Sequence, residues 1–275
     1  MATTFQQLRI EPVSAAYWRV AFDHPPINLV DPQTILELQA LVGLIEEDAA
    51  LKVVVFESAH LDFFLARFDL SRAAELPVAP GPTGQPTWVD LTLRLARSRV
   101  VSIAKVRGRA RGAGSEFCLA CDLRYASLER AVFCQPEVPA GILPGGGALE
   151  RLPLLAGRSR ALEIVLGGDD FDAATAERYG WITRALPDAQ LDAFVDALAH
   201  RIAGFDALAL AEAKQLIDRH VLPPATDLVE SQNAMIQALL RPSTRERGAR
   251  ARAAAAADPL DFELHLGRRL GELPG

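Results

Sequence analysis

Two glutamates stand in surroundings that suit proton transfer. Glu116 lies in KVRGRARGAGSEFCLACDLRY at 105–125, where glycines follow an apolar strand pattern and a helix pattern opens at Ser115. Glu137 lies in AVFCQPEVPAGILPGGG at 131–147, with no basic residue in the local sequence. A buried carboxyl without a cationic partner has a raised pKa, which suits a general acid at neutral pH. The simpler alternatives are a first-turn acid that complements a helix dipole for Glu116 and an exposed loop acid for Glu137.

The strand-to-helix turn before Glu116 has the composition of a site for negative charge. It contains Gly108, Gly112 and Gly114, and glycines let a ligand approach the main chain. Backbone N–H groups at a helix N-terminus stabilise a developing negative charge. The dinucleotide fingerprint GxGxxG fails because Phe117 takes the place of its third glycine, and the chain has no GK[ST] phosphate loop.

A second loop of the same kind is LDFFLARFDLSR at 61–72. It follows a strand pattern and precedes a helix pattern that opens near Asp69. Because it leaves a neighbouring strand, it is placed to bring a second N–H to the same point. An ordinary connecting loop, with phenylalanines packed on the core, is the alternative.

The sequence lacks the motifs of several other kinds of catalytic site. The chain has no HExxH and no GxSxG, and its five histidines are scattered. Cys118 and Cys121 form a CxxC, but Cys134 is the only other cysteine, so a four-cysteine zinc site is impossible. We therefore expect three buried, apolar cysteines and no metal.

Composition favours a soluble globular protein of the cytoplasm. The chain has 275 residues, of which 50% are hydrophobic and 23% charged. A chain of this size and composition can form a sizeable hydrophobic core without disulfide or metal cross-links. A net charge of -6 argues against a nucleic-acid-coating protein, although a local patch can still bind an anionic small molecule. Three cysteines suggest a reducing compartment, and we see neither a secretory signal in MATTFQQLRIEPV nor an apolar run long enough to span a membrane.

The first part of the chain alternates strand and helix patterns. Strands are expected at 16–22, 52–56 and 100–106, and the valine-rich KVVVF at 52–56 is typical of a strand buried on both faces. Asp31 and Pro32 begin a helix as N-cap and first helical residue, and a second helix pattern covers 88–97. Four prolines and two glycines predict a loop at 76–86. Strands that alternate with helices predict an α/β fold with parallel pairing.

The last part of the chain is helical from Pro187 onwards, with Ala-rich and Leu-rich stretches at 190–218, 226–240 and 243–257. We divide the chain into an α/β core at 1–195 and a helical C-terminal region at 196–275. The stretch 244–258 carries Arg245, Arg247, Arg250 and Arg252. These arginines can meet an anionic ligand or a neighbouring subunit, and a solvated helix face is the alternative.

Several blocks together resemble the crotonase (enoyl-CoA hydratase/isomerase) superfamily, over most of residues 5–200. They are HPPIN, FFLARFDL, VRGRARGAGSEFCLACDLRYA, FCQPEVPAGILPGGGALERL and FDAATAERYGWITRALP. The resemblance implies a crotonase-like spiral of repeated ββα units with an all-helical C-terminal region used for oligomerisation. It also implies an acyl-CoA substrate and a homotrimer or a hexamer built as a dimer of trimers.

The resemblance assigns roles to individual residues. Two backbone N–H groups, those of Phe68 and Ala113, fall where the family stabilises an enolate-like oxyanion. The two glutamates of the family's hydratases fall on Glu116 and Glu137, which become the expected catalytic residues. The residues that flank the two N–H groups are expected to bind substrate; they are Ala66, Arg67, Asp69, Leu70, Gly112 and Gly114.

Two positions depart from the family pattern. Ala113 replaces a glycine, which is tolerable because the donor is the main-chain N–H. Arg67 replaces the glycine that usually precedes the first N–H. If that position needs a positive φ, arginine costs about 1 kcal/mol or more, or the loop differs. Alternatively, Arg67 projects into the substrate channel and selects an unusual acyl group.

Hydration of a 2-enoyl-CoA is the expected activity, since both glutamates are present. Isomerisation of an enoyl-CoA, hydrolysis of an acyl-CoA and thioester binding without turnover remain the alternatives. No cofactor is expected apart from the coenzyme A of the substrate. The walls of the acyl pocket are expected from 76–90 and the C-terminal helices; Trp88 and Phe64 are candidate lining residues, although ordinary core packing is the simpler interpretation of both.

Overall fold

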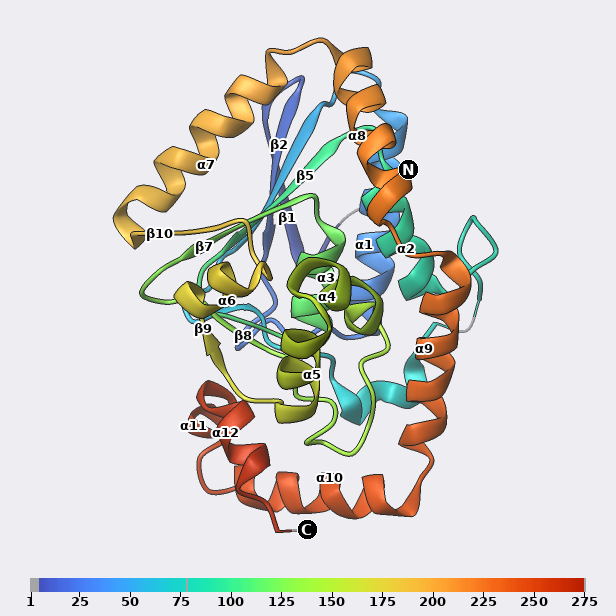
Figure 1. Ribbon diagram of the computed structural model, residues 1–275, viewed down its shortest axis with the longest axis vertical. Helices are drawn as coiled ribbons and strands as arrows, with labels where there is room; N and C mark the ends of the chain where they lie inside the picture. The colour runs from blue at the N-terminus through green and yellow to red at the C-terminus, as the bar shows by residue number, and fades with distance from the viewer. Residues whose placement is uncertain (1–4, 78, 275) are drawn as a thin grey trace.

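The computed structural model describes residues 5–77 and 79–274 (Figure 1). Val78, which falls in the loop expected at 76–86, and the first four residues, which open the segment searched for a secretory signal, lie outside the described residues. No described helix is both long enough and apolar enough to cross a membrane.

The larger sheet has six strands in the order β1-β2-β3-β5-β7-β10. Its strands are β1 (Leu8–Ser14), β2 (Tyr17–Phe22), β3 (Val53–Ser58), β5 (Val101–Val106), β7 (Leu123–Ser127) and β10 (Arg184–Leu186). Only β1 and β2 pair antiparallel, as a hairpin; the other neighbours pair parallel. The predicted parallel pairing through crossovers is therefore confirmed.

The smaller sheet has the order β4-β6-β8-β9. Its strands are β4 (Phe63–Leu65), β6 (Arg109–Arg111), β8 (Val132–Cys134) and β9 (Phe171–Asp172). The pairs β3–β4, β5–β6 and β7–β8 each place one strand in each sheet, and a helix follows every pair. This is the repeated ββα spiral that the resemblance implied.

Twelve α-helices and one 3-10 helix, η1, occupy the described residues. They are α1 (Pro32–Glu47), η1 (Leu70–Glu75), α2 (Thr87–Arg97), α3 (Ala113–Ala120), α4 (Ala148–Ala156), α5 (Arg158–Gly167), α6 (Ala173–Tyr179), α7 (Asp188–Ala203), α8 (Ala207–Val221), α9 (Ala225–Leu239), α10 (Pro242–Ala255), α11 (Pro259–Leu264) and α12 (Leu266–Gly271). After β10, the residues that the structure describes form helices and no strand, as predicted. The predicted division after residue 195 falls inside α7, and it stays a prediction.

The larger sheet is buried on both faces, as the valine-rich pattern predicted. Val54 and Phe56 of β3 pack into the main core with α1, α2 and α3. Val53 and Val55 point to the opposite face, where α7 covers the sheet (Figure 1). The alternation follows from the two-residue repeat of a strand.

The predicted start of α1 is confirmed in detail. The Asp31 carboxylate accepts the N–H of Thr34 at 2.8 Å, and the Thr34 hydroxyl in turn receives the N–H of Asp31 at 3.2 Å. This reciprocal capping box, with Pro32 at the first helical position, fixes where the chain turns into α1.

Candidate active site

A cavity of about 590 Å³ lies where the first turns of the spiral meet the C-terminal helices. Both candidate glutamates, Phe68 and Ala113 line it. The rest of its wall is mainly apolar and comes from α2, the 136–146 segment and α9 to α12, including Trp88, Ile142, Leu143, Met235, Leu239, Phe262, Leu266 and Leu270. The prediction that the C-terminal helices would contribute walls is confirmed for these residues. Of the two proposed lining residues, Trp88 lines the cavity and Phe64 belongs only to the core.

The peptide that carries the N–H of Phe68 is held in a fixed orientation. A β-bridge joins Val30 to Phe68. The N–H of Val30 donates to the carbonyl of Arg67 at 2.8 Å, and the N–H of Asp69 donates to the carbonyl of Val30 at 2.9 Å. In a trans peptide the C=O and N–H point opposite ways, so the N–H of Phe68 points away from Val30. No described group accepts it.

The N–H of Ala113 is the first of helix α3. Gly112 is the N-cap and has a φ of 49°, a conformation that favours glycine. Its carbonyl accepts the N–H of Glu116 at 2.8 Å, which closes the first turn of α3. The first N–H groups of a helix have no intrahelical acceptor, so that of Ala113 is free for a ligand. The helix begins two residues before the predicted Ser115, because Gly112 allows an earlier turn.

Gly114 brings the two N–H groups together by packing. A Cβ at this position would lie 2.1 Å from the carbonyl oxygen of Leu65, the last residue of β4. Only glycine therefore lets α3 approach the chain that continues to Phe68. Gly114 does not line the cavity, and its expected contact with substrate stays a prediction.

The other expected substrate-binding residues divide into two groups. Arg67, Asp69 and Leu70 line the cavity. Ala66 is fully buried in a small core cluster, and Gly112 acts through its backbone conformation; neither of them lines the cavity. The helix expected near Asp69 is present as the short 3-10 helix η1, and the Asp69 carboxylate caps it by accepting the N–H of Ser71.

Glu116 is anchored on one carboxylate oxygen. Its Oε1 accepts the N–H of Gly146 at 2.7 Å and that of Ala148 at 3.2 Å, at the start of α4. Burial raises the pKa of Glu116 to about 7, although these two N–H groups favour the ionised form. Its side chain therefore links two helices, which the simple alternative of a first-turn acid does not explain.

Glu137 has no such anchor. It is only 9% exposed, so the alternative of an exposed loop acid is wrong. Its Oε1 lies 2.7 Å from where a Cβ of Gly112 would stand, and its Oε2 has no hydrogen-bond partner among the described residues. Burial raises the pKa of Glu137 well above the usual range, and the nearby Glu116 carboxyl adds to the shift. The two carboxyls thus differ in environment: backbone N–H groups favour the ionised form of Glu116, and burial beside Glu116 favours the protonated form of Glu137.

Sequence reasoning missed a buried arginine behind Glu116. Arg151 of α4 is 4% exposed and donates from Nη1 to the carbonyl of Gly146 at 3.3 Å. Its positive charge lowers the pKa of Glu116 and opposes the effect of burial. The position of Arg151, one turn into the helix that follows PGGG, could have indicated an arginine near the site. An arginine at such a position is more often exposed to solvent, so the sequence did not single it out.

The strained alternative for Arg67, a positive φ at this position, is wrong. Among the described non-glycine residues, only Asn28 has a positive φ, so Arg67 fits its loop without that cost. Its guanidinium forms an ion pair with Glu263 of α11 and donates to the carbonyl of Phe68 at 3.1 Å. Arg67 therefore lines the cavity and also joins this loop to the C-terminal helices.

The four arginines of α10 do not act alike. Arg247 donates to the carbonyls of Pro139 and Leu270, and Arg250 donates to that of Pro274 at 2.8 Å, so both hold the C-terminal segments in place. Arg245 and Arg252 line the cavity together with Arg247. Binding of an anionic ligand by these arginines stays a prediction.

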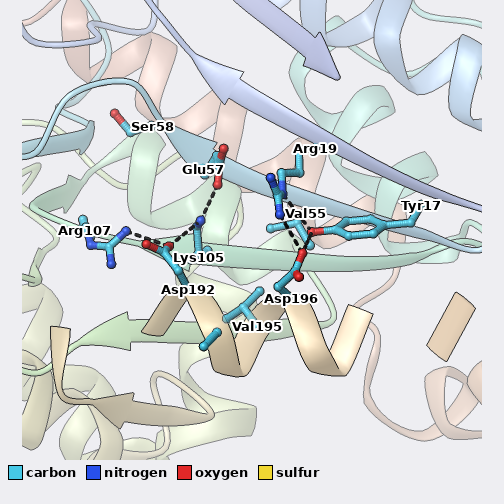
Figure 2. Close-up of a pocket in the computed structure, with 11 residues that line it drawn as sticks. Tyr17, Arg19, Val55, Glu57, Ser58, Lys105, Arg107, Asp192, Val195 and Asp196 are labelled. Carbon is cyan, nitrogen blue, oxygen red and sulfur yellow. Dashed lines mark hydrogen bonds and ion pairs between the residues drawn. The ribbon is translucent and has the colours of Figure 1, made fainter. Parts of the chain in front are cut away.

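A second pocket, of about 510 Å³, lies between the larger sheet and α7 (Figure 2). Its charges satisfy one another: Lys105 pairs with Glu57 and Asp192, and Arg19 pairs with Asp196. These ion pairs fasten α7 to the sheet. The three cysteines are free and buried, as expected, and no three His, Cys, Asp or Glu side chains gather in metal-binding geometry within residues 5–77 and 79–274.

Comparison with known proteins agrees with this architecture. A family model described as enoyl-CoA hydratase/isomerase matches residues 13–253. The short-chain-enoyl-CoA hydratase of Clostridium acetobutylicum is 30% identical over 193 residues, 70% of this chain and 74% of that protein. The carnitinyl-CoA dehydratase of Escherichia coli K12 is 30% identical over 197 residues, 72% of this chain and 75% of that protein.

Solved structures agree as well. A candidate enoyl-CoA hydratase from Streptomyces avermitilis superposes with a TM-score of 0.94 and 39% identity over 100% of both chains. An enoyl-CoA hydratase from Mycobacterium avium subsp. paratuberculosis shares the fold, with a TM-score of 0.77 and 23% identity over 88% of this chain and 93% of that one. The fold is that of the crotonase superfamily. The chain belongs to its enoyl-CoA hydratase/isomerase family, which is a family of enzymes.

Proposed function

We propose that this enzyme hydrates a 2-enoyl-CoA thioester in the cavity described above. The observation that carries the proposal is the pair of buried carboxyls, Glu116 and Glu137, in unlike environments in one cavity. A reaction that adds both parts of water across a double bond needs one group to give a proton and another to take one.

The thioester carbonyl accepts hydrogen bonds from the N–H groups of Phe68 and Ala113. Negative charge develops on this oxygen as water adds to Cβ, and the positive end of α3 adds to its stabilisation. One such preorganised donor contributes roughly 3–4 kcal/mol to the transition state. Both N–H groups line the cavity and have no acceptor within the described part of the chain, which supports this role.

The two protons move between water, carboxyls and substrate. Ionised Glu116 takes a proton from the water whose oxygen bonds to Cβ, and protonated Glu137 gives its proton to Cα. The product is a 3-hydroxyacyl-CoA, and exchange of one proton between the carboxyls resets the site. The mechanism uses no metal and no redox cofactor; coenzyme A enters only as part of the substrate.

The apolar walls suit an apolar acyl chain, and Arg245, Arg247, Arg250 and Arg252 are proposed to bind the phosphates of coenzyme A. The relatives named hydratase and dehydratase above support a CoA thioester as the substrate. We further propose a cytoplasmic enzyme that binds neither nucleic acid nor membranes. Its C-terminal helices would join subunits into a homotrimer or a dimer of trimers.

The test is loss of the enoyl-thioester absorbance when crotonyl-CoA and longer 2-enoyl-CoAs are added. Wild-type enzyme should remove the absorbance, and Glu137→Gln should slow the reaction by about 10²–10⁴-fold. Calorimetry on the same samples should show that the variant still binds the thioester. Binding without turnover by wild-type enzyme would instead favour isomerisation, thioester hydrolysis or a silent binding protein.

A further inference from the structure

Trp88 presents an unpaired hydrogen-bond donor in the cavity wall. Its side chain is 7% exposed, it lines the cavity, and its Nε1 has no partner among the described residues. By contrast, the buried indole of Trp181 donates to the hydroxyl of Ser115 at 3.2 Å. Leaving a buried N–H without a partner destabilises the fold, so a donor retained there calls for a reason.

The unpaired N–H lies beside the free oxygen of Glu116. A Cβ on Gly146 would stand 2.5 Å from Nε1 of Trp88 and 2.4 Å from Oε2 of Glu116. Both atoms therefore border the space above the bare Cα of Gly146. Because Oε1 of Glu116 already accepts two backbone N–H groups, Oε2 is the oxygen left to take a proton.

The indole is held rigidly in this position. Trp88 lies in the first turn of α2, where the Thr92 hydroxyl donates to its carbonyl at 2.9 Å. The ring packs into the main core cluster. A donor fixed before the substrate arrives needs no reorganisation during the reaction.

We propose that Trp88 is a positioning residue whose indole N–H donates to the oxygen that Glu116 deprotonates. In hydration this is the oxygen of water, and in the reverse reaction it is the 3-hydroxyl oxygen of the product. The two hydrogens of the water face the two carboxyls, one lone pair accepts from Trp88, and the other lone pair is free to attack Cβ. Trp88 donates a hydrogen bond and transfers no proton. This inference rests on the proposed hydratase activity.

The test is Trp88→Phe, assayed in both directions. The phenyl ring removes the donor and keeps part of the packing. We expect kcat for hydration of crotonyl-CoA to fall about tenfold with its KM unchanged, since one net hydrogen bond corresponds to about a factor of ten. In the reverse direction the KM for 3-hydroxybutyryl-CoA should rise about tenfold, because its hydroxyl loses the contact. The equilibrium constant links the two directions, so the two changes must match.

Two further variants separate positioning from packing. Trp88→His places a ring N–H where the indole N–H stood, since the five-membered rings superpose, and it should recover part of the lost kcat. Trp181→Phe also removes a buried indole N–H, and it should lower the free energy of unfolding. It should not raise the KM for 3-hydroxybutyryl-CoA relative to the KM for crotonyl-CoA.

If Trp88→Phe raises the KM values for crotonyl-CoA and 3-hydroxybutyryl-CoA equally, or leaves the kinetics unchanged, the proposed role of Trp88 is wrong. The proposed hydration by the wild-type enzyme would not be affected by either result. Absence of hydration in the wild-type enzyme would overturn the proposed function and this inference together.

Discussion

At the scale of single residues, the site separates two identical functional groups by their surroundings. Glu116 and Glu137 are both buried, so burial raises the pKa of each. Two backbone N–H groups and the charge of Arg151 favour the ionised form of Glu116 alone. The division into base and acid thus comes from hydrogen bonds at the start of α4, and the carboxyls themselves are the same.

This arrangement should cost stability as the pH rises. The pKa of Glu137 is raised above its ordinary value of 4.5, so above that pH the folded protein holds a proton that the unfolded chain has lost. The free energy of unfolding therefore falls with rising pH, starting near the ordinary value and continuing through the raised pKa. Glutamine does not titrate, so Glu137→Gln removes this dependence of the free energy of unfolding on pH. We expect the variant to be about 10²–10⁴-fold slower, yet more stable than wild type at pH 8 by about 1 kcal/mol, or roughly 2–4 °C.

Thermal melts at pH 4.5 and pH 8 check the prediction, since the difference between variant and wild type should widen with pH. A difference that is the same at both values would mean that Glu137 is ionised in the folded protein.

The bare Cα of Gly146 should be essential to activity. Gly146→Ala would place a methyl group against both the Glu116 carboxylate and the Trp88 indole. A displacement of reacting groups by about 1 Å costs on the order of 100-fold in rate, so we expect a loss of that size in kcat. Gly167→Ala is the matched control, since its Cβ meets nothing within 4 Å and its φ is not positive. Comparable rates for both variants would contradict the tight packing at Gly146.

At the scale of elements, the site depends on a contact between segments far apart in the chain. The loop after β4 carries the N–H of Phe68, and Arg67 in this loop pairs with Glu263 of α11. A second arginine, Arg111 of β6, donates to the carbonyl of Leu264 at 3.1 Å and pairs with Asp170. Two arginines of the α/β core thus hold α11 against the cavity.

Restoring the family's glycine at position 67 should therefore harm the enzyme. Arg67→Gly leaves the carboxylate of Glu263, which is 9% exposed, without its cation. We expect a loss of about 2 kcal/mol in the free energy of unfolding and a lower kcat. The double variant with Glu263→Gln should recover part of the stability, which denaturant titration of all four proteins would measure. A rise in rate on Arg67→Gly would show that the arginine obstructs the site.

At the scale of the whole molecule, helix α8 is only partly covered by the rest of the chain. Lys214 of α8 pairs with Asp122, and Leu210 packs on the core beside α7. No residue of α8 is buried, however, and its large apolar side chains Leu208, Leu216 and Ile217 are 65%, 55% and 63% exposed. Large apolar side chains gathered on one helix are typical of a surface that contacts another subunit. In Figure 1 this helix lies in the upper part of the molecule. None of its residues lines the cavity.

The proposed trimer or hexamer can be tested on this helix. Leu216→Glu combined with Ile217→Lys should dissociate the assembly, because charged groups would be buried without partners. Light scattering coupled to size-exclusion chromatography measures the mass directly. Leu61→Glu is the control, since Leu61 is 60% exposed outside the C-terminal helices, and it should leave the mass unchanged. A monomeric wild-type protein would contradict the proposal.

Local patterns in the chain were enough for several features. The cap at Asp31, the buried valines of β3 and the turn at Gly112 each depend on neighbouring residues, so the sequence predicts them. For Glu137 the sequence left burial and an exposed loop position open, and the structure shows that it is buried. The strands β4, β6, β9 and β10 were missed because two or three residues give no periodicity; they form only because a neighbouring strand supplies the hydrogen bonds.

The finer chemistry of the site depends on partners that are distant in the sequence. Arg67 and Glu263 are 196 positions apart, and the residue types alone could not indicate whether Arg67 strains its loop or finds a carboxylate. Likewise, Glu116 receives its two N–H groups from residues 30 and 32 positions later. The pKa of a buried group depends on the few atoms that surround it, and only the tertiary fold brings those atoms together.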